Sequence, residues 1–256
     1  MIHKQAIIDP KASIAADVQI GPWTIIGPDV EIQSGTVIAS HVVIKGPTSI
    51  GRDNKIYQFA TLGEDSPDKK YSGERTHLSI GDRNVFRECC TIHRGTVQGG
   101  GVTRIGDDNL LMAYTHVAHD CTIANRVVFS NNASVAGHVQ VQDDVCLGGM
   151  VGVHQFCVVG AHSFAAAGSI ILKDVPPFVM VSGYPGEAHG LNAVGLERRG
   201  FSATTITALK QAYKIIFRQS LTIQEAIIKL GDIAQDVPEV QSLIAFLSQS
   251  TRGIIR

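Results

Sequence analysis

A six-residue repeat of aliphatic residues organises the first two thirds of the chain. Taking every sixth position from Ile8 gives ten aliphatic residues in succession, the last being Leu62. The same phase returns at Ile80, and after a shift of one residue it continues from Ile105 to Ile171. A helix repeats about every 3.6 residues and a strand every two, so neither element alone explains this period. The repeat predicts short strands that alternate with tight bends, each strand turning one aliphatic residue inward.

The residues between the aliphatic positions support this interpretation. Glycine often follows the aliphatic residue directly, and Gly, Asn and Asp suit tight bends. Three strands and three bends close a triangular coil, and stacked coils pair their backbones about 4.8 Å apart. This pattern, which spans about residues 6–175, resembles the hexapeptide-repeat family, whose fold is a left-handed parallel β-helix. The resemblance implies that residues 1–175 form a domain of the β class.

Two segments interrupt the repeat. Residues 63–79 are polar and keep no aliphatic register, and residues 97–104 contain three consecutive glycines. We expect both segments to leave the regular coils as loops. Because loops that leave a repetitive scaffold often carry function, the face from which they emerge is a candidate functional face.

The last third of the chain has a different pattern. The segment from Val175 to Pro177 ends the coils, and residues 176–190 read as a linker rich in Gly and Pro. Apolar residues then recur at helical spacing, with possible helix starts at Ser220 or Thr222 and at Pro238. We therefore expect residues 191–256 to form a small α-helical domain beside the prism.

Composition narrows the class of function. The net charge is −1 and the pI about 6.8, which argues against a nucleic-acid partner bound through many phosphate contacts. No apolar run approaches the ~18 residues of a membrane-spanning helix, so we expect a soluble protein without stable membrane insertion. The five cysteines are odd in number and show no C-x-x-C spacing, which favours a reducing compartment, the cytoplasm.

The histidines are concentrated on one predicted face. Hexads eighteen residues apart stack, so those led by Val117, Val135 and Val153 form a column, and the hexad of Ile92 joins it if the glycine-rich segment is looped out. Five of the ten histidines fall on this column: His93, His116, His119, His138 and His154. Asp120 and His138 occupy equivalent positions in successive coils.

Three interpretations of the histidine column remain open from the residues alone. It could be a structural ladder of hydrogen-bonded histidines. It could be a zinc site, which needs three converging imidazoles. It could also serve acid–base catalysis, because histidine accepts a proton near neutral pH and Asp120 is placed to orient His119.

Several longer motifs make the resemblance more specific. They are His116 to Cys121 (HVAHDC), Thr91 to Thr96 (TIHRGT), Ala136 to Val139 (AGHV), Val153 to Cys157 (VHQFC), Arg198 to Phe201 (RRGF) and Ser250 to Arg256 (STRGIIR). In these motifs, and over essentially its whole length, the chain resembles the acyl-[acyl-carrier-protein]:UDP-N-acetylglucosamine O-acyltransferase family. That family catalyses the first step of lipid A synthesis in Gram-negative bacteria.

The resemblance implies a role for each motif residue. His119 would be the general base, Asp120 would hold its imidazole, and the backbone N–H of Gly137 would stabilise the oxyanion. The resemblance also implies a homotrimer with the cleft between subunits, and no metal or other cofactor. The expected substrate-binding residues are Asp68, Lys70, His93, His116, His138, His154, Gln155, Asn192, Arg198 and Arg199.

Two further assignments concern the ends of the substrates. Ala167 stands where the family measures acyl length, and alanine there implies a somewhat shorter chain than glycine would accept. The family often has a glutamate where this chain has Val194, which puts one nucleotide contact in doubt.

Residues 191–256 carry eight Lys or Arg against five Asp or Glu. Lys210, Lys214 and Arg218 form a basic stripe at four-residue spacing, which suits an acidic partner, the acyl carrier protein.

Two alternatives accompany this interpretation. The related N-acyltransferase of the same pathway acts on a UDP-3-O-acylglucosamine, but that family has an extra N-terminal domain, whereas the repeats here begin at about residue 8. The other alternative is a zinc-binding hexapeptide enzyme or a non-catalytic scaffold. Zinc analysis and loss of the His119 side chain would distinguish these.

Overall fold

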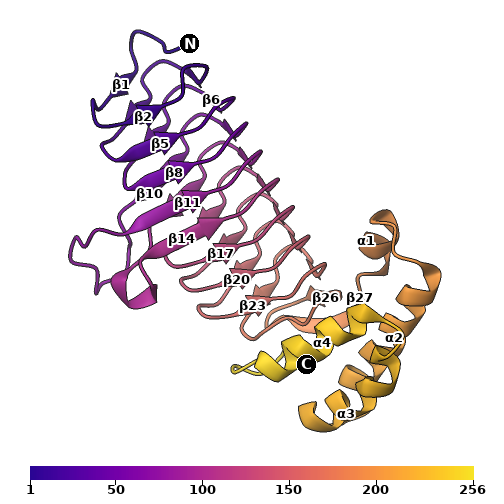
Figure 1. Ribbon diagram of the computed structural model, residues 1–256. Helices are drawn as coiled ribbons and strands as arrows, with labels where there is room; N and C mark the ends of the chain where they lie inside the picture. Colours follow the sequence, from indigo (N-terminus) through magenta and orange to yellow (C-terminus); the bar gives the residue numbers. More distant parts are fainter.

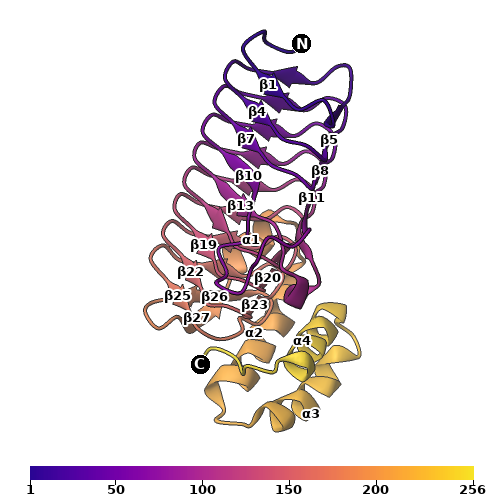
Figure 2. The same cartoon turned by 90° about the vertical axis from the view of Figure 1, so that its left-hand side faces the viewer.

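The protein is an elongated three-sided prism that carries a group of helices at its carboxy-terminal end (Figures 1 and 2). The computed structural model describes residues 1–256. Each turn of the chain contributes one short strand to each of three parallel sheets, which we call faces 1, 2 and 3 in the order in which the chain first visits them. The predicted strand-and-bend coil is therefore confirmed.

The three faces contain twenty-seven strands. Face 1 consists of β1 (Ile7–Ile8), β4 (Ile25–Ile26), β7 (Val43–Ile44), β10 (Thr61–Glu64), β13 (Thr91–His93), β16 (His116–Val117), β19 (Ser134–Val135), β22 (Gly152–Val153) and β25 (Ile170–Ile171). Face 2 consists of β2 (Ser13–Ile14), β5 (Val30–Ile32), β8 (Thr48–Ile50), β11 (His77–Ile80), β14 (Val102–Ile105), β17 (Thr122–Ile123), β20 (Gln140–Val141) and β23 (Val158–Val159). Face 3 consists of β3 (Gln19–Ile20), β6 (Val37–Ile38), β9 (Lys55–Ile56), β12 (Val85–Phe86), β15 (Leu110–Leu111), β18 (Val128–Phe129), β21 (Cys146–Leu147), β24 (Phe164–Ala165), β26 (Val179–Ser182) and β27 (Glu187–Leu191).

The register of face 1 confirms the predicted stacking of the hexads. Val117 pairs with Val135, and Val135 pairs with Val153. Ile92 pairs with Val117, so the glycine-rich segment is indeed looped out between them. The histidine-bearing coils are therefore consecutive along the prism.

The aliphatic residues of the repeat fill the interior of the prism. Ile26, Ile44 and Leu62 of face 1 are at most 1% exposed, and from Ile20 onward the corresponding residues of the other faces are at most 3% exposed. Burying a side chain of this size stabilises the fold by about 1.5–3 kcal/mol. Because every coil repeats this burial, the prism needs no other core.

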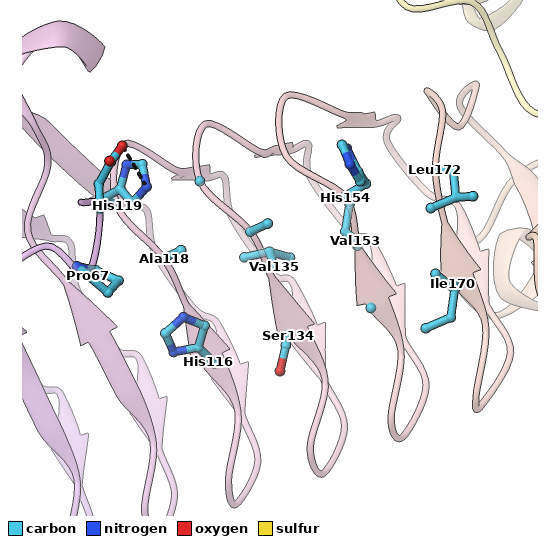
Figure 3. Close-up of a pocket in the computed structure, with 14 residues that line it drawn as sticks. Pro67, His116, Ala118, His119, Ser134, Val135, Val153, His154, Ile170 and Leu172 are labelled. Carbon is cyan, nitrogen blue, oxygen red and sulfur yellow. Dashed lines mark ion pairs between the residues drawn. The ribbon is translucent and has the colours of Figure 1, made fainter. Parts of the chain in front are cut away.

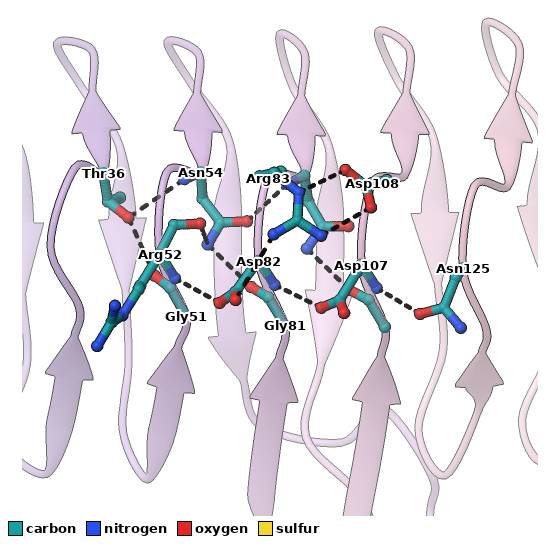
Figure 4. Close-up of polar contacts among 12 residues, drawn as sticks. Thr36, Gly51, Arg52, Asn54, Gly81, Asp82, Arg83, Asp107, Asp108 and Asn125 are labelled. Carbon is teal, nitrogen blue, oxygen red and sulfur yellow. Dashed lines mark hydrogen bonds and ion pairs between the residues drawn. The ribbon is translucent and has the colours of Figure 1, made fainter.

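Polar ladders hold the edges where the chain turns. At the edge between faces 2 and 3, the side-chain oxygens of Asn54 and Asn84 accept hydrogen bonds from the backbone of Asn84 and Asn109, at 2.9 and 3.0 Å (Figure 4). On the outer side, Asp82 and Asp107 likewise accept a backbone N–H from the preceding coil, at 2.7 Å each (Figure 4). These bonds satisfy backbone donors that the bends leave without a strand partner.

The segment expected to be a linker contains most of a β-hairpin. Strand β26 extends face 3 in parallel with β24, and β27 returns antiparallel to β26. The segment contains Gly and Pro, but β26 itself is largely apolar, and it pairs with the open sheet edge that β24 presents at the end of the prism. The hairpin therefore caps face 3 and leads into the helices.

Four α-helices follow the hairpin. They are α1 (Ala193–Arg198), α2 (Ala203–Arg218), α3 (Ile223–Ala234) and α4 (Pro238–Gln249). Thr222 caps α3 with a capping box, and Pro238 is the first residue of α4. Both helix starts were predicted from the sequence. The chain ends against the prism, where Ile254 pairs with Asp174. None of the four helices combines the length and hydropathy that a membrane crossing requires.

Candidate functional site

A histidine–carboxylate pair lies at the edge between faces 1 and 2, which we call edge 1–2. His119 follows β16, and its Nδ1 is 2.8 Å from Oδ2 of Asp120. The two residues are only 6% and 8% exposed. The ionised carboxylate accepts the proton of Nδ1, which leaves Nε2 of His119 as the basic nitrogen. The structure thus brings together the predicted base and the group predicted to orient it.

The second interruption of the repeat holds Asp120 in place. Its first residues form a short 3-10 helix, η1 (Val97–Gly99), and Thr96 caps this turn. The backbone N–H and Oγ1 of Thr96 donate to the two carboxylate oxygens of Asp120 at 2.7 and 2.6 Å. The backbone N–H of Asp120 donates to Oγ1 of Thr103 at 2.8 Å. Both carboxylate oxygens are therefore fixed before any substrate binds.

Gly137 lies one coil further on and packs against the imidazole of His119. A Cβ atom at this position would lie 2.5 Å from Cε1 and 2.6 Å from Nε2 of His119, so only glycine fits beside the ring. The backbone N–H of Gly137 makes no hydrogen bond within the chain, although its carbonyl accepts one from Phe156. A free donor next to the basic nitrogen is the arrangement that an oxyanion requires.

His138 extends the edge on the far side of Asp120. Its Nε2 is 3.7 Å from Oδ2 of Asp120, and its ring stacks on Phe156 at a centroid distance of 4.5 Å. Burial lowers the pKa of His138 and the nearby His119 acts in the same direction, outweighing the opposite effects of Asp120 and Asp68. The neutral form of His138 is therefore favoured near neutral pH.

A cavity of about 500 Å³ opens in front of Nε2 of His119 and runs over face 1 (Figure 3). His116, His119, Gly137 and Asp68 stand at one end. The remainder of the lining is mostly apolar: Ala118, Val135, Ala136, Val153, Ile170 and Leu172. A polar, histidine-rich end joined to an apolar groove suits an amphipathic substrate.

The first interruption of the repeat, between β10 and β11, covers the polar end of this cavity. Its Asp68 reaches to 3.9 Å from Nε2 of His119. Arg94 anchors the loop from below, because its buried guanidinium donates to the carbonyl of Gly63, to the hydroxyl of Tyr71 and to Asp65. The loop is thus held over the histidine by a cation from the next coil.

His93 and His116 continue the polar surface beneath the loop. Nδ1 of His93 is 2.6 Å from the carbonyl oxygen of Asp65, and its ring meets that of His116 edge to face. Burial, with a smaller effect from His93 and His119, lowers the pKa of His116 to about 4. His116 is therefore neutral at physiological pH and can donate or accept a hydrogen bond.

One group in the site could hold a metal ion. The ligand atoms of His119, Asp120 and His138 all lie within 4.8 Å of one another. Tetrahedral zinc ligands, with bonds of about 2.0–2.1 Å, lie roughly 3.3 Å apart. The 2.8 Å between His119 and Asp120 is instead the length of a charge-assisted hydrogen bond. The geometry therefore fits a histidine–carboxylate pair better than a metal centre.

Three of the predicted substrate-binding residues lie apart from His119, between face 3 and α1 of the same chain. Asn192, Arg198 and Arg199 line a separate cavity of about 500 Å³ between face 3 and α1. Asn192 caps α1 through Oδ1, and its Nδ2 donates to the carbonyl of His162. Nε of Arg199 is 3.2 Å from Oδ1 of Asp144. Within one chain, these residues and His119 do not share a cavity.

Comparison with known proteins identifies the family to which this chain belongs. A model described as "UDP N-acetylglucosamine O-acyltransferase, domain 2" matches residues 174–255, and the bacterial transferase hexapeptide model matches residues 103–137. The acyl-[acyl-carrier-protein]–UDP-N-acetylglucosamine O-acyltransferases of Thiobacillus denitrificans and Stutzerimonas stutzeri are 58% and 57% identical to this chain, covering all of it and 99% of their own length. The chain belongs to this O-acyltransferase family.

Solved structures agree with this family assignment. LpxA from Acinetobacter baumannii is 52% identical and superposes with a TM-score of 0.98, covering all of this chain and 99% of its own. The UDP-N-acetylglucosamine acyltransferase of Francisella novicida is 39% identical, also with a TM-score of 0.98, covering all of this chain and 94% of its own. The fold is therefore the left-handed parallel β-helix of hexapeptide repeats with a small carboxy-terminal helical domain.

The other residues predicted for this O-acyltransferase lie around the two cavities. His154 lines the apolar groove, and the carbonyl of its neighbour Gln155 is 3.1 Å from Nδ1 of His154. Ala167 is exposed at the edge between faces 3 and 1, on the opposite edge of face 1 from His119 and just before its last strand, β25. Val194 lines the cavity on face 3 with Arg198.

The four lysine and arginine residues predicted to contact the substrate or the carrier protein, apart from Arg198 and Arg199, are all exposed. Lys70 is exposed, and its backbone N–H donates to Asp68. Lys210, Lys214 and Arg218 are all exposed on α2. Their stripe therefore lies on the helical domain and outside both cavities.

Sequence reasoning missed the residues that support the site. Thr96 and Arg94 both belong to the TIHRGT motif, but their partners are 24 and 29 residues away in the chain. The motif marked the segment as important. The loop geometry that gives these residues their roles could not be read from the repeat, because both loops leave it.

Proposed function

We propose that this protein transfers a (R)-3-hydroxyacyl group from acyl carrier protein to the 3-hydroxyl of UDP-N-acetylglucosamine, the first step of lipid A synthesis. The observation that carries the proposal is the buried His119–Asp120 pair, whose free Nε2 faces the cavity beside an unpaired backbone N–H of Gly137. Full-length relatives named for this reaction support the substrate assignment. The mechanism below follows from these positions.

His119 acts as the general base. Its Nε2 takes the proton of the sugar 3-hydroxyl as the oxygen attacks the thioester carbonyl and a C–O bond forms. The carbonyl oxygen becomes an oxyanion that accepts the N–H of Gly137. When this intermediate collapses, the C–S bond breaks and the leaving thiolate takes the proton from the imidazolium. Asp120 stabilises that imidazolium and fixes the tautomer.

The acyl chain and the sugar bind at different ends of the cavity in front of His119. The apolar groove on face 1 takes the acyl chain, which runs from Gly137 toward the edge where Ala167 lies. Asp68, Lys70 and His93 contact the sugar from the covering loop and the coil below it, with His116, His138, His154 and Gln155 around them. Asn192, Arg198 and Arg199 bind the nucleotide.

A homotrimer reconciles the two separate cavities. The His119 cavity lies on face 1 and the Arg198 cavity on face 3, on either side of the edge between these faces, which we call edge 3–1. In a three-fold assembly with edge 3–1 at the axis, face 1 of each subunit meets face 3 of the next. The Arg198 cavity of one subunit then completes the His119 cavity of its neighbour.

Edge 3–1 also has the surface of a subunit contact. Four large apolar or aromatic side chains along it, Trp23, Phe59, Tyr114 and Met150, are each more than half exposed. An exposed apolar stripe of this kind marks a protein contact. It supports placing this edge on the three-fold axis.

The basic stripe on α2 recruits the carrier protein. Lys210, Lys214 and Arg218 stand on the helical domain, where they attract an acidic surface at long range. Reversing one of these charges, as in Lys214→Glu, would slow capture of the acylated carrier protein and leave the chemical step unchanged.

Mass spectrometry of the product tests the proposed reaction. Purified protein, UDP-N-acetylglucosamine and a mixed pool of acyl carrier proteins should yield one O-acylated nucleotide sugar, and His119→Ala should lower kcat by ~10²–10⁴. Acyl transfer by His119→Ala at the wild-type rate would refute the proposal that His119 is the general base. A chelator control tests the zinc alternative. If the enzyme used zinc, removal of the metal by the chelator would abolish the activity.

Subunit mixing tests the shared site. His119→Ala and Arg198→Ala should each be nearly inactive alone. Unfolded together and refolded as mixed trimers, they should regain activity because some interfaces pair an intact His119 with an intact Arg198. No recovery from mixed trimers would contradict the proposed interface.

A further inference from the structure

A buried carboxylate behind the cavity on face 3 has no role in the function described above. It belongs to Asp144, which is 8% exposed at the edge between faces 2 and 3. Arg199 lines the cavity and contacts this carboxylate, whereas Asp144 itself does not line the cavity. We propose that Asp144 is a positioning residue, which orients the guanidinium of Arg199 to bind the diphosphate of the nucleotide. This inference rests on the proposed function.

Arg199 contacts both the side chain and the backbone of Asp144. Its Nε donates to Oδ1 at 3.2 Å, and its Nη2 donates to the carbonyl oxygen of Asp144 at 3.1 Å. These contacts use two of the five N–H groups of the guanidinium, both on one edge, and the other three have no partner in the chain. The free groups include the fork formed by Nη1 and Nη2, which can bind a phosphate through two parallel hydrogen bonds.

Neighbouring coils hold the carboxylate of Asp144 in place. In the preceding coil, Nε and Nη2 of Arg126 donate to its two oxygens at 3.1 and 2.9 Å. In the following coil, Nε2 of His162 is 3.8 Å from Oδ2. Burial would raise the pKa of the carboxyl group, but the two arginines and His162 outweigh burial and lower it. The group is therefore ionised at neutral pH and fixed before the nucleotide binds.

Helix α1 is attached to two successive coils by the residues at its ends. At its start, Nδ2 of Asn192 donates to the carbonyl of His162 at 2.9 Å. At its end, Arg199 is the C-cap residue and contacts Asp144, which occupies the position of His162 one coil earlier. Because this short helix is held at both ends, the contact with Asp144 also restrains Arg198, which lines the same cavity.

The cavity keeps positive charge in spite of the nearby carboxylate. The single negative charge of Asp144 is shared between two guanidinium groups, those of Arg126 and Arg199. Arg198 lines the cavity and forms no ion pair within the chain. Both Arg198 and the free fork of Arg199 are therefore available to a diphosphate bound in the cavity.

Calorimetric titration of UDP-N-acetylglucosamine and steady-state kinetics test this inference. Asp144→Ala should raise the Kd and the KM for UDP-N-acetylglucosamine about 2- to 10-fold, the effect of ordering one long side chain during binding. The kcat and the KM for acyl carrier protein should stay unchanged. Asp144→Asn, which tolerates the same left-handed bend and keeps an acceptor for Nε of Arg199, should show a smaller rise.

Asp108→Ala is the matched control. Asp108 lies two coils earlier at the same edge, with a φ of 59° against 60° for Asp144, and it likewise accepts two hydrogen bonds from an arginine, Arg83. It makes no hydrogen bond or ion pair with a residue that lines the cavity. The control therefore removes an equivalent ion pair and places alanine in the same bend, but it should leave the Kd for the nucleotide unchanged.

A double variant separates the orientation of Arg199 from a general loosening of the helical domain. Arg199→Ala alone should raise the Kd roughly 10- to 100-fold, the effect of losing hydrogen bonds to a charged group. Adding Asp144→Ala to that variant should raise the Kd no further, because the group that Asp144 orients is already absent.

Three results would overturn the inference. They are an unchanged Kd for Asp144→Ala, tighter binding by that variant, or a further rise in Kd when it is added to Arg199→Ala. Tighter binding would show that the carboxylate only weakens the charge of Arg199. The proposed function fails differently, with wild-type protein forming no acylated sugar while the titration still reports whether Asp144 acts through Arg199.

Discussion

The substitution Gly137→Ala probes the contact on which the proposed active site depends. The added methyl carbon would lie 2.5 Å from Cε1, 2.6 Å from Nε2 and 3.2 Å from Nδ1 of His119. Carbon atoms in contact normally lie about 3.5–4.0 Å apart, so the ring must retreat by ~1 Å. His119 lines the cavity, and a movement of the ring into that space would take it away from its 2.8 Å hydrogen bond with Asp120.

The size of the effect follows from that displacement. A misplacement of about 1 Å at a reacting group costs on the order of 10²-fold in rate, and complete loss of a general base costs ~10²–10⁴. We therefore expect kcat to fall by about 10²- to 10³-fold. The backbone N–H of residue 137 is retained, so the oxyanion donor itself is not removed. Overpacking should cost at most about 1–3 kcal/mol of stability, because the ring can move toward open space.

The assay combines steady-state kinetics with thermal unfolding. Gly27→Ala is the control, since a Cβ there comes no nearer than 3.4 Å to any neighbour, the carbonyl oxygen of Ile44, and should change neither kcat nor Tm appreciably. The double variant Gly137→Ala with His119→Ala identifies the cause, because the methyl group has little to displace once the imidazole is gone. The reasoning is refuted if Gly137→Ala alone keeps kcat within about twofold, or if it costs as much without the imidazole as with it.

Three further predictions address the loop, the stability and the pH response. Arg94→Met should release the loop that carries Asp68, raising KM for UDP-N-acetylglucosamine about tenfold and lowering stability by about 1–3 kcal/mol, because it removes the hydrogen bonds that the buried guanidinium donates to the loop; an unchanged KM in kinetic assays would count against this anchor. Gly231→Ala in α3 should stabilise the protein by about 0.5–1 kcal/mol in thermal unfolding, since a Cβ there meets no atom within 4 Å; a lower Tm would contradict it. Folding lowers the pKa of His116 from 6.5 to about 4, so between these pH values His116 binds a proton in the unfolded chain but not in the folded chain. The free energy of unfolding therefore decreases as the pH falls from 6.5 to about 4. Urea unfolding of His116→Gln should show a shallower loss between pH 7 and 4, and equal slopes would exclude this contribution.

The periodic part of the fold could be predicted from the sequence. The side chain at each sixth position must point inward, and this requirement is local, so Ile26 or Val117 reveals its place without knowledge of distant residues. The stacking of the coils then follows from the spacing of eighteen residues between equivalent hexads. This is why the pairing of Ile92 with Val117 was predicted across the glycine-rich loop. The helix starts at Thr222 and Pro238 were equally local signals.

The support of the site could not be predicted in this way. Thr96 contacts Asp120, and Arg94 contacts Asp65, only because two loops outside the repeat fold back onto the coils. The β-hairpin near residues 179–191 likewise depends on the open sheet edge of β24, with which β26 pairs. In each case the deciding partner is distant in sequence and has no periodic relation to the residue.

The six-residue repeat specifies the prism, the histidine column and the order of its coils, because a repeated burial requirement acts on neighbouring residues. The folded chain was needed to show that His119 and Asp120 form a fixed pair and that Gly137 packs against the imidazole. It also decided that Arg198 lies on a different face from His119. These facts depend on distances between coils, loops and faces, which the hydrophobic pattern does not encode.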